Sequence, residues 1–167
     1  MQAENNKKQL IRDILQLLLF VVVLYLVTSF LLKRCYIASP SMEPTLMTGD
    51  VVLFLNDAVT GVRREDIIAF DQEGMLVCKR VIGVGGDHIL IKDGYAFVNG
   101  ERMDSDSYTQ IPASTFAGLK DEYDVPEDTV FVMGDNRCDS FDSRFWDNPF
   151  VDVKSIKGRY LTTLVHS

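Results

Sequence analysis

The chain has 167 residues, of which 47% are hydrophobic and 25% are charged, and its formal net charge is −7. This length accommodates one folded domain with an appendage, and the apolar content excludes a largely disordered protein. The negative charge belongs to residues 35–167, which hold 22 acidic and 12 basic side chains. Residues 1–34 hold two acidic and five basic side chains. Because an acidic domain repels phosphate backbones, we expect no nucleic-acid partner.

The first predicted element is a membrane-spanning helix. Residues 14–32 read ILQLLLFVVVLYLVTSFLL and contain no charged side chain. As a helix this run covers about 28 Å, close to the hydrocarbon thickness of a bilayer. A cleaved secretory signal is the alternative, but its apolar core would be shorter, and here Lys33 and Arg34 follow in place of a small-x-small cleavage site. We therefore predict an uncleaved anchor within residues 1–34, with the lipid bilayer as a partner.

The basic side chains around this anchor indicate its orientation. Three of them precede the apolar run and two follow it, namely Lys7, Lys8, Arg12, Lys33 and Arg34. Flanks that are richer in lysine and arginine stay in the cytoplasm. The pattern favours a single-pass protein of the cell membrane with a cytoplasmic N-terminus and an extracytoplasmic domain.

After the anchor the sequence has the pattern of β structure. Short β-branched and aromatic runs separated by turns predict strands over residues 51–55, 67–70, 76–84, 129–133 and 159–165. Residues 88–92 and 95–98 are expected to form a hairpin, because Asp93-Gly94 suits a two-residue type I′ turn. The acidic stretch 101–128, with its two prolines, is expected to be a loop or a reduced insertion.

These elements predict a mostly β fold, with one N-terminal transmembrane helix followed by a single β-rich domain over residues 35–167. The anchor is expected to lead directly into the first loop of that domain at residues 35–40. Its three cysteines are odd in number and lack paired metal-ligand spacing, so we expect no metal site. A bridge between Cys78 and Cys138 is an option in an oxidising compartment, but free thiols are favoured.

The stretch ASPSMEPTL, residues 38–46, places Ser41 between two prolines. Pro40 and Pro44 disfavour helical conformations in the residues before them, so Ser41 is expected on an extended, stiffened segment. Such stiffness suits the geometry of nucleophilic attack. Ser39 can present its hydroxyl to the same side and serve as an oxyanion donor. A purely structural Ser-Pro-Ser loop is the alternative.

A serine nucleophile needs a group that takes its proton, and the two histidines are poor candidates. His88 begins a hairpin arm and His166 is the penultimate residue, which are typical positions of surface histidines. Lys79 can act instead if its pKa lies several units below the ordinary value of about 10.4. Burial within the apolar run 76–84 would supply that shift. The alternative is an edge strand that carries Lys79 as a charge against aggregation.

Three short boxes follow the anchor in order: SPSMEPTLMTGD at 39–50, KRVIGVGGD at 79–87 and GDNRCDSFDSR at 134–144. They resemble the signature boxes of bacterial type I signal peptidases, the membrane-anchored serine–lysine proteases that remove signal peptides from exported proteins. Three coordinated boxes are far more specific than any one of them. The short chain and single span resemble the compact forms of Gram-positive bacteria.

The resemblance implies roles for the serines and the lysine. Ser41 would be the nucleophile and Lys79 the general base. The hydroxyl of Ser39 and the backbone N–H of Ser41 would form the oxyanion hole. No metal or other cofactor is implied.

The third box would support this pair. The resemblance implies that Ser140 orients the lysine and that Asp142 and Arg144 form an ion pair, which two residues apart on an extended segment can share one face. It also implies a turn that brings this box beside the lysine strand, formed by Gly134, Asp135 and Asn136. The aromatic residues that follow are expected in a packed core, with the lipid interface as the alternative: Phe145, Trp146 and Phe150.

The implied activity is that of a serine endopeptidase that cleaves after small residues, at sites like Ala-x-Ala. The expected partners are the signal peptides of secretory preproteins, and a specialised peptidase for pilins is a narrower variant. Eukaryotic-like signal peptidases would carry a histidine in place of Lys79, and self-cleaving repressors would carry a DNA-binding head. Non-enzymatic pilus-assembly helpers on this fold can lose the serine or the lysine, and both are present here.

Overall fold

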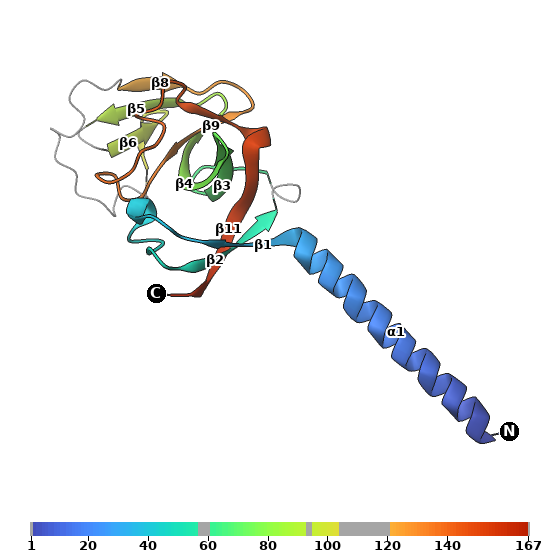
Figure 1. Ribbon diagram of the computed structural model, residues 1–167. Coiled ribbons are helices and arrows are strands. Elements are labelled where there is room, and N and C mark those ends of the chain that lie inside the picture. Colours follow the sequence, from blue (N-terminus) through green and yellow to red (C-terminus); the bar gives the residue numbers. More distant parts are fainter. Residues whose placement is uncertain (1, 57–60, 93–94, 104–120, 167) are drawn as a thin grey trace.

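The structure is a computed structural model that describes residues 2–56, 61–92, 95–103 and 121–166. A long helix, α1 (Gln2–Leu31), projects away from a β-rich domain (Figure 1). Its segment Gln9–Leu31 has a mean hydropathy of 2.6 and is not buried against the domain. The helix is therefore long and apolar enough to cross a membrane, as predicted.

Among the described residues, the larger of two sheets has seven antiparallel strands in the order β1-β2-β11-β3-β4-β9-β10 (Figure 1). Its strands are β1 (Leu32–Tyr36), β2 (Val51–Asn56), β3 (Ile67–Gln72), β4 (Met75–Val84), β9 (Thr129–Met133), β10 (Phe150–Asp152) and β11 (Ile156–Val165). Five of these strands, β2, β3, β4, β9 and β11, confirm the predicted ones. The mostly β fold is confirmed as well.

The smaller sheet has four strands among the described residues, in the order β7-β6-β5-β8. They are β5 (His88–Lys92), β6 (Tyr95–Val98), β7 (Glu101–Arg102) and β8 (Glu122–Asp124). The predicted hairpin is confirmed by the antiparallel pairing of β5 with β6, and its expected Asp93-Gly94 turn lies outside the described residues. The prediction of a loop over 101–128 is wrong at both ends, because β7 and β8 pair with the two edges of this hairpin.

The strand β1 follows α1 without a linker, which corrects the prediction of a loop that includes residues 35 and 36. Its sequence, LKRCY, holds two cations and lacks a clear strand pattern. Pairing with β2, from Leu32 opposite Leu55 to Tyr36 opposite Val51, determines its conformation. The sheet therefore begins where the helix ends.

Three clusters of buried hydrophobic side chains fill the described part of the domain. Trp146 lies edge-on to Phe70 at 6.2 Å between ring centroids, and Phe150 lies edge-on to Phe131 at 6.5 Å. The expected core position is thus found for Trp146 and Phe150. It is wrong for Phe145, whose side chain stays at the surface.

Candidate active site

The loop that carries Ser41 is a single 3₁₀ turn, η1 (Pro40–Met42). Ser39 before it and Glu43 after it are extended, as the two prolines predict. Ser41 itself is not extended, because a proline at the first helical position favours the turn and the Glu43 N–H donates to the Pro40 carbonyl at 3.0 Å. The stiffness expected for Ser41 thus comes from a closed turn.

Burial and two hydrogen bonds fix this turn on the sheet. The side chain of Met42 is 1% exposed and packs in a hydrophobic cluster with Ile37. The backbone N–H of Asn136 donates to the Ser41 carbonyl at 3.1 Å, and its side-chain amide donates to the Pro40 carbonyl at 3.2 Å. The third sequence box therefore holds the serine turn directly.

Ser39, Ser41 and Lys79 line one cavity of about 160 Å³, which we call the serine cleft. Residues 36–38 contribute to one wall and residues 76–79 of β4 to the other. The hydroxyl oxygens of Ser39 and Ser41 are 3.3 Å apart. Among the described residues no hydrogen bond joins Ser41 Oγ to Lys79 Nζ, which does not rule out a proton transfer between them, because such bonds often form only when substrate binds.

Lys79 is a buried lysine on β4, with β3 paired on one side of it. Its side chain is largely enclosed, with the residue 4% exposed, and β3 pairs with β4 at this point through Ile68. Burial lowers the pKa of Lys79 below the ordinary lysine value, while the charge of Asp142 opposes part of that shift and the charge of Arg144 adds to it. The interpretation of Lys79 as a protective surface charge is therefore wrong.

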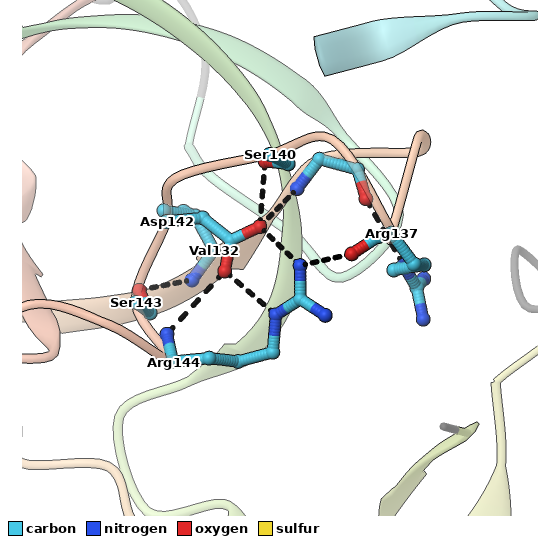
Figure 2. Close-up of polar contacts among 7 residues, drawn as sticks. Val132, Arg137, Ser140, Asp142, Ser143 and Arg144 are labelled. Atoms are coloured by element: carbon cyan, nitrogen blue, oxygen red, sulfur yellow. Dashed lines mark hydrogen bonds and ion pairs between the residues drawn. The ribbon is translucent and has the colours of Figure 1, made fainter. Parts of the chain in front are cut away.

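Asp142 is the centre of the polar contacts of the third box (Figure 2). Its carboxylate accepts five hydrogen bonds, from the Gly134 N–H, the Ser140 hydroxyl, the Arg144 backbone N–H, and the Arg144 Nε and Nη2. The ion pair with Arg144 has a 2.8 Å contact. The segment is a turn and not the expected extended stretch, because the Phe145 N–H donates to the Asp142 carbonyl at 2.8 Å.

Ser140 lies in this network and not in a direct contact with the lysine. Its hydroxyl donates to Asp142 at 2.7 Å (Figure 2). Among the described residues no hydrogen bond joins Ser140 to Lys79. Since the charge of Asp142 acts on Lys79, Ser140 is linked to the lysine through that carboxylate.

Asp135 connects the third box to β4, the strand that carries Lys79. Its buried carboxylate accepts hydrogen bonds from Arg80 Nε at 2.7 Å and Nη2 at 2.6 Å. Arg80 follows Lys79 in β4, so this bidentate pair sets the box beside the lysine. Arg80 had no assigned role in the sequence-based prediction. The sequence feature that points to Arg80 is a second cation, next to Lys79, inside an apolar strand.

The three cysteines are free, and no bridge joins Cys78 to Cys138. Cys78 lies in the wall of the serine cleft beside Lys79. Burial raises the pKa of Cys78 to about 12. A thiol held in its protonated form is a poor nucleophile, so Cys78 is a poor candidate for that role.

The three boxes thus meet in one place, with two serines and a buried lysine along a cleft and the third box behind them. The family model described as signal peptidase, peptidase S26, matches residues 10–165. The chain belongs to the signal peptidase family, peptidase S26. Family membership confirms the predicted enzyme class, a serine endopeptidase of the signal peptidase I type.

Several relatives of this peptidase are bacterial. A probable signal peptidase I-2 of Synechocystis sp. is 32% identical over 143 residues, which cover 80% of this chain and 63% of the relative. The chain thus spans less than two thirds of that protein. Signal peptidase I P of Bacillus subtilis subsp. natto is 35% identical over 84% of this chain and 82% of its own length. A crystal structure of a signal peptidase I from Enterococcus faecalis is 31% identical, with a TM-score of 0.48, over 62% of this chain and 98% of that one.

The close approach of the boxes makes Gly134 a sensitive position of this peptidase. A Cβ atom there would lie 2.2 Å from Ser140 Oγ and 2.4 Å from the Ser41 carbonyl oxygen. We expect Gly134→Ala to lower the free energy of unfolding by about 2 kcal/mol, because such overpacking forces the backbone to shift. Peptidase activity should fall with it, since the shift displaces the Ser41 turn.

Thermal and denaturant unfolding together with an activity assay would measure both effects. Gly61→Ala is the matched control, because a Cβ at Gly61 meets no atom within 4 Å. If Gly134→Ala were as stable and as active as Gly61→Ala, the close packing of the boxes around Gly134 would be contradicted.

Proposed function

We propose that this peptidase removes N-terminal signal peptides from exported proteins, cutting after small residues at sites like Ala-x-Ala. The observation that carries the proposal is the serine cleft, where two serines and a buried lysine line one cavity in a member of the signal peptidase family. Ser41 is the nucleophile and Lys79 is the general base. Ser39 provides the side-chain donor of the oxyanion hole.

The reaction begins when neutral Lys79 takes the proton of the Ser41 hydroxyl. The oxygen attacks the scissile carbonyl carbon, and the Ser39 hydroxyl and the Ser41 backbone N–H donate hydrogen bonds to the oxyanion. The C–N bond then breaks, and Lys79 returns the proton to the leaving amine. Lys79 next takes a proton from water, whose oxygen attacks the acyl carbon. The bond to Ser41 Oγ then breaks, and Lys79 returns the proton to Ser41 Oγ.

The residues of the third box act as positioning groups in this scheme. Asp142 is held by Arg144 and Ser140, so its carboxylate keeps a fixed place near the lysine. Asp135 and Asn136 keep the lysine strand and the serine turn together. These contacts preserve the attack geometry, because a small displacement of either group lowers the rate strongly.

Two strand edges flank the serine cleft and suit an extended peptide. β1 is the edge strand of the larger sheet. β9 pairs with β4 only from Arg80 to Val84, so the first half of β4 has β3 on one side and the cleft on the other. A substrate can pair with backbone groups on both sides. The small volume of the cleft fits alanine-sized side chains.

The apolar helix supports a site beside a membrane. We infer a cytoplasmic tail and anchor in residues 1–34, a single pass, and an extracytoplasmic peptidase domain in residues 35–167 with a reduced insertion at 101–128. The apolar core of a signal peptide would lie in the same bilayer as α1, which raises its effective concentration at the cleft. The acidic charge of the domain disfavours nucleic acid as a partner.

The pH dependence of cleavage tests the proposed function. We expect kcat/KM for a peptide with an Ala-x-Ala site to rise with pH, because only Lys79 without its extra proton can take the serine proton. Since burial lowers the pKa of Lys79, the rising limb should have its midpoint below the ordinary lysine value of about 10.4. Initial rates over a pH series would locate it, and an optimum well below about pH 6 would contradict a lysine base.

A further inference from the structure

A second cavity, of about 480 Å³, adjoins the serine cleft and has no part in the reaction described above. Met75 and Val77 of β4 line one side, and the loop that follows Ser140 lines the other with Phe141, Phe145 and Trp146. Val77 belongs to both cavities. The two cavities therefore adjoin at Val77, and we call the second one the aromatic cavity.

The two cavities lie mainly on opposite faces of β4. Successive side chains of a strand point to opposite faces. Cys78 packs against the hydrophobic cluster that contains Met42, beneath the serine turn. Val77 packs with Trp146 against a different cluster. The part of the serine cleft beneath the serine turn, with Leu76 and Cys78, is thus on one face, and the aromatic cavity, with Met75 and Val77, is on the other. Lys79 lies on the Val77 face by the same alternation and lines the end of the cleft.

An extended substrate in the cleft would present its side chains to both faces in turn. If the first and third residues before the cut occupy the serine cleft, the residue between them points to the face of Val77. On the same premise, the part of the substrate before the cut extends from Ser41 and Lys79 toward Tyr36 and Leu76, which also line the cleft, and so passes Val77.

We propose that the aromatic cavity is a subsite for the second residue before the cut, the variable residue of an Ala-x-Ala-like site, and that it favours a long basic side chain. This inference rests on the proposed function, since it requires a peptide in the serine cleft. It assigns to this enzyme a preference at the position between the two small residues.

The walls of the aromatic cavity suit the stem of lysine or arginine. Phe141 is 69% exposed and Met75 is 65% exposed, so large apolar surfaces are open to a ligand. The rings of Phe141 and Phe145 are stacked, with centroids 6.1 Å apart. Methylene groups pack on such surfaces, and a cationic head group is attracted to the aromatic faces.

The charges around the cavity select against an acidic side chain. Glu73 and Asp147 contribute carboxylates to the lining, and no lysine or arginine is among the described lining residues. Arg144 lies over the Phe145 ring at 5.1 Å from its centroid. Its guanidinium is held by Asp142, so that cation is already neutralised.

Three peptides that differ only at the second residue before the cut would test the subsite: lysine, glutamate and glycine. We expect the wild-type enzyme to cleave the lysine peptide about fivefold to tenfold faster in kcat/KM than the glutamate peptide, the range that two partly exposed charge pairs supply. The double variant Glu73→Gln/Asp147→Asn should reduce this ratio to about two or less. Added salt should reduce it in the wild type as well.

Two controls separate the subsite from general charge and size effects. Glu122→Gln/Glu127→Gln removes two exposed carboxylates outside both cavities and should leave the wild-type ratio unchanged. Phe141→Ala should remove the preference for lysine over glycine, because it removes one aromatic wall. A second peptide set, varied at the first residue after the cut, should show no dependence on Glu73 and Asp147.

Equal rates for the lysine and glutamate peptides, or a ratio unmoved by the double variant, would overturn the subsite and leave the peptidase intact. A dependence on Glu73 and Asp147 confined to the position after the cut would overturn it too. If the wild-type enzyme cleaved none of the peptides, the proposed function would fail together with the subsite.

Discussion

Ser41→Ala and Lys79→Met should each lower kcat/KM for an Ala-x-Ala peptide by at least about 10⁴-fold. In the proposed mechanism Ser41 supplies the attacking oxygen, and Lys79 takes its proton and returns it to the leaving amine. Because the two groups act as one unit, the double variant should be hardly less active than either single variant. Initial rates on purified full-length protein in detergent, with mass spectrometry of the products, would measure the loss.

The stability of Lys79→Met shows whether its loss of activity comes from the missing base or from a disrupted fold. Burial lowers the pKa of Lys79 in the folded state, so the unfolded chain binds this proton more tightly. The resulting penalty on folding is fully present below the folded-state pKa and disappears as pH rises toward the ordinary value. Near neutral pH, Lys79→Met should therefore unfold at the wild-type temperature or above it.

Lys154→Met is the matched control, since Lys154 is exposed and far from the cleft residues in sequence. It should keep the wild-type rate. Cleavage at more than about one per cent of the wild-type rate by either Ser41→Ala or Lys79→Met would refute the dyad.

Asp142→Asn should lower the free energy of unfolding by about 3–5 kcal/mol and reduce activity strongly. The substitution keeps the shape of the side chain but removes the charge that neutralises buried Arg144. An uncompensated buried charge costs about this much. The new NH₂ group would also face an N–H or O–H donor on either side, because the native carboxylate accepts from Gly134, Ser140 and Arg144.

Denaturant unfolding compared with Asp139→Asn would measure the effect of Asp142→Asn. Asp139 is exposed in the same loop, and its variant should lie within about 0.5 kcal/mol of wild type. Equal stability of the two variants would show that the network in Figure 2 does not hold the third box.

Much of this architecture is predictable because local pattern and tertiary structure agree. The strands around Val52, Phe70 and Val132 have β-branched or aromatic side chains, and they lie inside the larger sheet. The three boxes place Ser41 and Lys79 as candidates for one site. The burial of Lys79 also follows from its apolar neighbours in β4.

Other features depend on contacts that no local pattern contains. Residues 32–36 become a strand because β2 offers them an edge, although Lys33 and Arg34 obscure the pattern. Glu122–Asp124 becomes a strand because β5 offers it an edge for pairing. The conformation at Asp142 depends on a hydrogen bond that its carboxylate accepts from the Gly134 N–H, and the sequence around Asp142 does not reveal this bond.

Because no linker separates α1 from β1, the distance between the end of the helix and the serine cleft is fixed. Asn56 donates to the Phe30 carbonyl at 2.9 Å, and Lys33 of β1 donates to the Lys157 carbonyl at 3.0 Å. These hydrogen bonds hold the junction of α1 and β1 against the domain. From Leu32 to Tyr36 the extended chain covers only about 17 Å. With α1 in the bilayer, as we propose, the serine cleft would lie at a set height above it, and a precursor would be selected by the distance between its cut site and the end of its own apolar segment.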